Sequence, residues 1–135
     1  MKILVVHRQE EVVETIKSAL PSDQLFIRYC NSGLDGLLAA RVESFDLIIC
    51  STDLPVVTGF EVVRNVRTNS VNKNVPVFFL VEEELTQKIN QLGASLGVTG
   101  MLYWKDLGKQ IAPMVREQVV VHPDILWEDI PARSI

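Results

Sequence analysis

Polar side chains that could take part in chemistry follow two apolar runs of the chain. His7 and Arg8 come after the first run, and Ser51 and Asp53 come after another. If both runs are parallel strands of one sheet, these side chains share the edge at which open α/β sheets carry their sites. An imidazole could activate a hydroxyl, a carboxylate could accept a group, and a guanidinium could hold an oxyanion.

The serine is a weak candidate for nucleophilic catalysis. Ser51 would need a base, His7 is the near candidate, and the sequence shows no third residue to orient the imidazole. We therefore expect Ser51 to be a hydrogen-bonded serine at a strand end. We expect Asp53 to be a loop carboxylate that pairs with Arg8 or caps a turn.

Composition excludes several classes of protein. The 135 residues suffice for one domain with a sizeable core, and 47% hydrophobic with 22% charged residues is ordinary for a globular chain. A net charge of −4 gives no overall attraction to nucleic acid or an acidic membrane. No signal peptide, ~20-residue apolar span, helix-turn-helix pattern or basic run is present. Cys30 and Cys50 form no metal spacing, and we interpret them as buried thiols of a cytoplasmic protein.

Hydrophobic periodicity predicts strands that alternate with helices. The predicted strands are Lys2–His7, Gln24–Cys30, Phe45–Ser51, Val75–Val81 and Val98–Trp104. The predicted helices between them are Glu10–Leu20, Gly33–Val42, Gly59–Thr68 and Glu82–Ala94, and the second carries its apolar face on Leu34, Leu37, Leu38 and Val42. Alternating units of this kind indicate an α/β fold, a three-layer (βα)5 sandwich of flavodoxin-like architecture with a parallel sheet in the order 2-1-3-4-5.

The last helix is less regular. Leu107, Ile111, Met114 and Val115 have helical spacing, but Pro113 lies among them and removes a backbone bond. Either this helix bends at Pro113 or its regular part begins there. We assign residues 1–118 to the domain and 119–135 to an extension that packs back on the domain or starts a linker.

Over residues 2–118 the chain resembles the receiver domains of response regulators. The matching segments are KILVV, DLII…LP…GFEVVR, VPVFFL and G-x-x-G-x-L, in this order. In that family two acids after strand 1 and an acceptor aspartate after strand 3 bind a divalent ion. A Ser or Thr ends strand 4, and a Lys ends strand 5.

The resemblance implies a pocket that has lost its chemistry. His7 and Arg8 take the places of the acids, Ser51 that of the acceptor, and Val81 that of the hydroxyl residue. Trp104 takes the lysine position by direct count, and a one-residue bulge would give it to Lys105. Three carboxylates are lost and a cation is gained, so we expect no metal and no cofactor. An Arg8–Asp53 ion pair would fill the space of Mg²⁺ and phosphate and lock one conformation.

We therefore interpret the chain as a pseudo-receiver, a phosphorylation-independent signalling module without enzymatic activity. Its partner would be a protein or an adjacent domain, with no nucleic acid and no membrane, and the oligomeric state stays open. In receivers the helix 4–strand 5–helix 5 face docks partners; here it would include Glu84, Lys88, Gln91, Tyr103 and Lys105. Two alternatives remain. One is an unconventional phosphoacceptor that uses Asp53 or Ser51, and the other is a domain that binds an anion or small ligand through Arg8 and Lys105.

Overall fold

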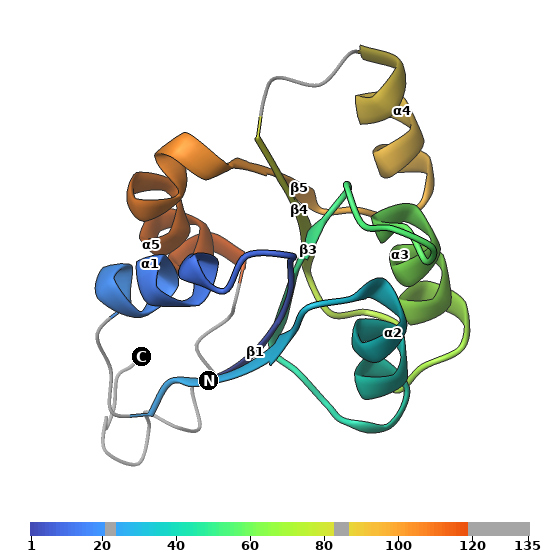
Figure 1. Cartoon of the computed structure of the whole chain (residues 1–135), viewed down its shortest axis with the longest axis horizontal. Helices are drawn as coiled ribbons and strands as arrows, with labels where there is room; N and C mark the ends of the chain where they lie inside the picture. The colour runs from blue at the N-terminus through green and yellow to red at the C-terminus, as the bar shows by residue number, and fades with distance from the viewer. Residues whose placement is uncertain (21–23, 83–86, 119–135) are drawn as a thin grey trace.

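The computed structural model describes residues 1–20, 24–82 and 87–118, in which strands and helices alternate (Figure 1). The strands are β1 (Lys2–Val6), β2 (Phe26–Cys30), β3 (Leu47–Ser51), β4 (Val77–Val81) and β5 (Gly100–Tyr103). The helices are α1 (Glu11–Ala19), α2 (Gly33–Val42), α3 (Gly59–Thr68), α4 (Gln87–Ser95) and α5 (Leu107–Gln118), with a 3₁₀ turn at Trp104–Asp106. Within these residues no helix is both long and apolar enough to cross a membrane.

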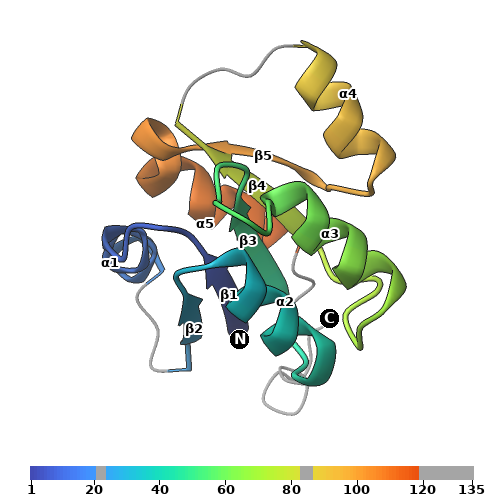
Figure 2. The ribbon, with the colours of Figure 1, turned by 45° about the vertical axis from the view of Figure 1, so that its right-hand side comes forward.

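The strands form one parallel sheet in the order β2-β1-β3-β4-β5. This confirms the predicted flavodoxin-like fold. Helices α1 and α5 cover one face of the sheet, and α2, α3 and α4 lie on the other (Figures 1 and 2). Alternate residues of β1 face the two layers: Ile3 packs in the core under α1 and α5, and Leu4 packs in the core under α2 and α3. The central strands β3 and β4 are buried along their whole length, as expected for strands covered on both faces.

The predicted elements are present, and the strands are shorter than predicted. The predicted residues that are not part of a strand lie at strand ends, where the chain turns. Phe45, for example, precedes β3, and its amide donates to the side chain of Asn72. At the carboxyl-terminal end of β5, Trp104 begins the 3₁₀ turn and does not continue the strand. Part of the predicted helix over Glu82–Ala94, residues 83–86, lies outside the described residues.

The prediction for the buried face of α2 was wrong. Leu34, Leu38 and Val42 are 53%, 48% and 81% exposed. The helix instead buries Gly33, Gly36, Ala39 and Ala40. It approaches β1 so closely that a Cβ on Gly36 would lie 2.5 Å from a methyl of Val6. Small residues therefore take the inner face, Leu34, Leu38 and Val42 point outward, and Leu37 is half-buried.

Helix α5 runs through Pro113 from Leu107 to Gln118. The alternative in which the regular helix begins near Pro113 is therefore wrong. Pro113 is exposed, so its ring faces solvent while Leu107, Ile111 and Met114 pack into the core.

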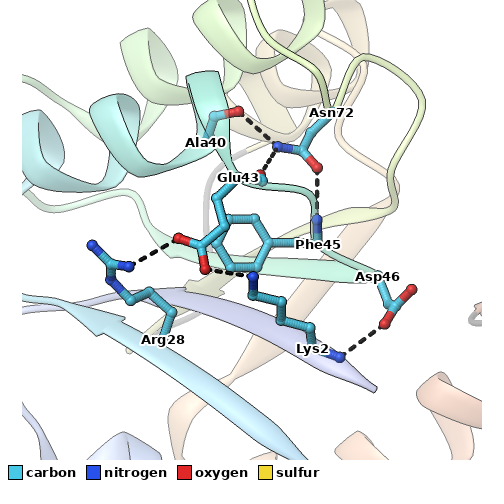
Figure 3. A network of polar contacts seen from close by, with 7 residues as sticks. All are labelled: Lys2, Arg28, Ala40, Glu43, Phe45, Asp46 and Asn72. Carbon is cyan, nitrogen blue, oxygen red and sulfur yellow. Dashed lines mark hydrogen bonds and ion pairs between the residues drawn. The ribbon is translucent and has the colours of Figure 1, made fainter.

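A polar network closes the amino-terminal edge of the sheet (Figure 3). Glu43 accepts from Lys2 at 2.5 Å and from Arg28 at 2.9 Å. Asn72 is 1% exposed; its amide nitrogen donates to the carbonyls of Ala40 and Glu43, and its oxygen accepts from the Phe45 amide. The network fixes the end of α2 against the sheet.

Candidate functional site

The predicted site residues converge at the carboxyl-terminal edge of the sheet. His7 follows β1, while Ser51 and Val81 are the last residues of β3 and β4. The register pairs Ser51 with Leu80 and Val81 with Tyr103, so neighbouring strands end side by side. The sheet therefore brings residues more than 90 positions apart in sequence into one region, as the parallel order predicts.

His7 is a buried, neutral imidazole. Its side chain is 4% exposed, and its Nδ1 accepts a hydrogen bond from the Gln9 amide at 3.0 Å. Burial lowers the pKa of His7, and the charge of Glu82 acts in the opposite direction. Because Nδ1 is an acceptor, the ring proton of the neutral form resides on Nε2.

Trp104 packs against this imidazole. The two ring centroids are 5.9 Å apart, and the planes are tilted by 34°. Trp104 is half-buried, whereas Lys105 is exposed. In the part of the chain that the structure describes, Lys105 makes no ion pair. The indole, and not the ammonium group, therefore stands beside His7.

Arg8 and Asp53 form the expected ion pair. Arg8 Nη1 lies 3.1 Å from Asp53 Oδ2, and the two side chains are 58% and 84% exposed. A pair so accessible to water contributes only ~0–1 kcal/mol to stability. It can set the local charge at this edge, but it is too weak to lock a conformation by itself.

Ser51 holds the backbone of the following loop. It is 6% exposed, and its Oγ accepts from the Asp53 amide at 3.1 Å. Among the described residues no hydrogen bond joins Ser51 to His7. The arrangement is that of a serine that caps a turn, and it gives the hydroxyl no base.

The β3–α3 loop is tightly held at its base and strained at its tip. A Cβ on Gly59 would lie 2.1 Å from the Ser51 carbonyl oxygen, so only glycine fits there. Thr58 and Glu61 form a reciprocal capping box at the start of α3. Val56, at the tip, has a φ of 67° and is 94% exposed.

Sequence reasoning missed two residues near His7. The Tyr29 hydroxyl donates to the His7 carbonyl at 2.7 Å and ties β2 to this end of β1. Glu82, directly after β4, is close enough for its charge to raise the pKa of His7. The position of Glu82 at a strand end could have indicated it, whereas nothing local pointed to Tyr29.

The predicted interaction face is only partly described. Gln91 is exposed, and Tyr103 is half-buried, with its amide donating to Gln110 Oε1 at 2.8 Å. Glu84 and the side chain of Lys88 lie outside the described residues.

Comparison with known proteins places this geometry in a family. Residues 3–109 match the family described as "Response regulator receiver domain". The chain belongs to this family. The receiver domain is 29% identical over 101 residues to the probable transcriptional regulator ycf29 of Pyropia yezoensis, which covers 75% of this chain and 45% of that protein. It is 32% identical over 80 residues to the transcriptional regulatory protein CusR of Escherichia coli K12, covering 59% of this chain and 34% of the regulator.

This receiver domain therefore spans less than half the length of these curated relatives. Among solved structures, the Vibrio cholerae chemotaxis protein CheY4 superposes with a TM-score of 0.75 at 26% identity, covering 87% of this chain and 97% of that one. The receiver domain of the histidine kinase CKI1 from Arabidopsis thaliana, complexed with Mg²⁺ and BeF₃⁻, gives 0.72 at 20% identity, covering 86% and 87% of the two chains. The second likeness supports the fold alone.

The residues of this receiver do not fit the divalent ion that the family implies. Mg²⁺ prefers carboxylate and water oxygens in octahedral geometry. Here a buried imidazole with Nδ1 already engaged, a guanidinium and a serine hydroxyl stand at the three positions. Over residues 1–20, 24–82 and 87–118, no group of three His, Cys, Asp or Glu side chains could hold a metal.

Proposed function

We propose that this receiver domain is a pseudo-receiver, a signal-transduction module that acts through protein–protein contacts without phosphorylation. It is a binding module and not an enzyme. A cytoplasmic site of action suits its two buried, unpaired thiols, Cys30 and Cys50. The observation that carries the proposal is the Arg8–Asp53 pair at the strand edge where the family holds its metal ion.

Electrostatics explains why this arrangement disfavours phosphoryl transfer. The charge that develops on a transferring phosphoryl group needs a metal ion or an equivalent cation. Arg8 supplies a cation, but the nearby Asp53 partly neutralises it and is exposed to water. Ser51 has no base, and Val81 has no hydroxyl with which to bond a phosphoryl oxygen.

The proposed contact surface is the α4–β5–α5 face. Gln91 and Lys105 are exposed there, Leu92 is 44% exposed, and Tyr103 is half-buried. A partly exposed aromatic among apolar and charged side chains is typical of protein interfaces. This chain matches transcriptional regulators in which the matched segment is only 45% and 34% of the protein, and this supports a neighbouring domain as one class of partner.

The test is incubation with a small phosphodonor and Mg²⁺, followed by intact mass. We expect no added phosphoryl group. We also expect no thermal shift with Mg²⁺ and BeF₃⁻, whereas the CKI1 receiver, solved with both, serves as the positive control. A phosphorylated product would overturn the proposal, and its site at Asp53 or Ser51 would identify an unconventional acceptor.

Restoring the carboxylates supplies the matched variant. His7→Asp, Arg8→Asp and Ser51→Asp together replace two cationic or imidazole groups and a hydroxyl by hard anionic oxygens. We expect this triple variant to bind Mg²⁺, measured by calorimetry, while the parent chain does not. If parent and variant behave alike, the loss of acids is not what sets metal affinity.

A further inference from the structure

We propose that residues 119–135, which follow α5, cover the outward face of α2. This outer α2 face consists of Leu34, Leu38 and Val42, which recur every four residues and therefore form one stripe. Their exposures of 53%, 48% and 81% leave a contiguous apolar surface on a helix whose inner side is already packed. A surface of this kind indicates an interaction site and not an ordinary solvated helix.

The stripe borders a groove between α2 and the edge strand β2. The groove has a volume of about 650 Å³ and is lined by residues of both elements, among them Leu38, Val42, Arg28 and Glu43. Phe26, 55% exposed, lies on the same edge strand, where the Lys2 ammonium sits 5.7 Å from its ring. An apolar segment laid along α2 would therefore have both a stripe and a groove to fill.

The extension starts at the correct edge of the sheet. Helices that join parallel strands run antiparallel to them, so Gln118 at the end of α5 and Val42 at the end of α2 both lie at the amino-terminal edge. The extension has 17 residues. Extended, these span up to about 55 Å, more than the roughly 30 Å width of a small domain. The chain can therefore pass from one face of the sheet to the other.

The composition of the extension matches this surface. About half of it is apolar, namely Val119, Val120, Val121, Ile125, Leu126, Trp127, Ala132, Ile130 and Ile135. At the end of the groove Glu43 pairs with Lys2 and Arg28, and Asp46 accepts from the Lys2 amide, so this cluster has no net charge. The match between the extension and the outer α2 face is therefore apolar.

Covalent linkage favours this segment over a second copy of the chain. The link to α5 gives the extension a high effective concentration at the outer α2 face, whereas a second copy must associate from solution.

Trp127 reports directly on the proposal. The chain has two tryptophans, and the variant Trp127→Phe keeps only Trp104. Subtracting the spectrum of this variant from that of the full chain gives the emission of Trp127. We expect Trp127 in the full chain to emit at shorter wavelength and to resist acrylamide quenching, compared with a synthetic peptide of residues 119–135. In Leu38→Glu, and separately in Val42→Glu, we expect emission and quenching to approach those of the peptide.

Leu92→Glu is the matched control, because Leu92 is similarly exposed but lies on α4. It should leave the Trp127 signal unchanged, and circular dichroism melts should show all three variants folded. The proposal is wrong if Trp127 in the parent is as accessible as in the peptide, or if neither α2 variant changes its quenching. It is also wrong if protection disappears on dilution together with a fall in molecular mass, because a second copy would then be the cover.

Discussion

Among single residues, Val56 is held in the least favourable backbone conformation. It is the one non-glycine position of the described chain with positive φ, 67°, and its exposed side chain makes little packing to offset this. A β-branched residue in the left-handed region costs ~1–2 kcal/mol. The strain lies in the loop that carries Asp53, so it is stored at the edge where the site residues meet.

Replacing Val56 by asparagine should therefore stabilise the domain. Asparagine tolerates the left-handed conformation, and we expect a gain of about 1 kcal/mol in the free energy of unfolding. Urea denaturation measures it. Val71→Asn is the control, because Val71 is also exposed (59%) but has an ordinary φ. An equal gain in both variants would show that exposure, and not backbone strain, is the cause.

His7 should make stability depend on pH in a definite direction. Burial lowers its pKa from 6.5, so the unfolded chain binds the proton more readily than the folded one. With respect to His7, the free energy of unfolding has its full value above the unfolded pKa of about 6.5. It decreases as the pH falls below that value. Equilibrium unfolding from pH 8 down to pH 5 should thus show a steeper loss for the parent than for His7→Gln. Parallel profiles would mean that His7 titrates alike in both states.

At the scale of elements, the close approach of α2 to β1 controls packing. Gly36→Ala would place a Cβ 2.5 Å from a buried methyl of Val6. We expect a loss of about 1–3 kcal/mol, which the better helix propensity of alanine does not offset. Gly108→Ala is the matched change in α5, where the new Cβ would meet Thr15 at an ordinary 3.9 Å. Chemical denaturation should show that variant as stable as the parent or slightly more so.

The same helix marks the limit of what its sequence could predict. Its bounds, Gly33–Val42, were predicted correctly because turn residues flank a helical pattern. Its buried face was not, because ranking by hydrophobicity favours leucines, whereas the spacing between α2 and β1 selects glycine and alanine. Interlayer distance is a property of the assembled fold, and no local pattern encodes it.

For the molecule as a whole, the parallel sheet followed from the alternation of strands and helices, and the convergence of His7, Ser51 and Val81 at one edge followed from the parallel strands. The Arg8–Asp53 pair was also predictable, since only loop residues of opposite charge were involved. Asn72 was not: it lay in a polar stretch predicted only to be a loop, yet it is 1% exposed and bonds to α2 and to Phe45. Its role depends on contacts about 30 residues away in sequence.

Asn72 should accordingly be among the polar residues most sensitive to substitution. Asn72→Asp removes the two amide donors and sets a carboxylate oxygen against the carbonyls of Ala40 and Glu43 (Figure 3). We expect a loss of ~3 kcal/mol or more. Asn74→Asp, at an exposed position in the same loop, should change stability by only about 0.5 kcal/mol or less. If the two variants unfold at the same urea concentration, the network does not hold this edge together.

The guanidinium at position 8 has one more consequence. It stands where the family has a metal-binding acid, so the proposed module has no covalent on-and-off cycle at this edge. Output from such a protein scales with copy number and with occupancy by its partner. A cell would then adjust the response through synthesis and turnover of the polypeptide.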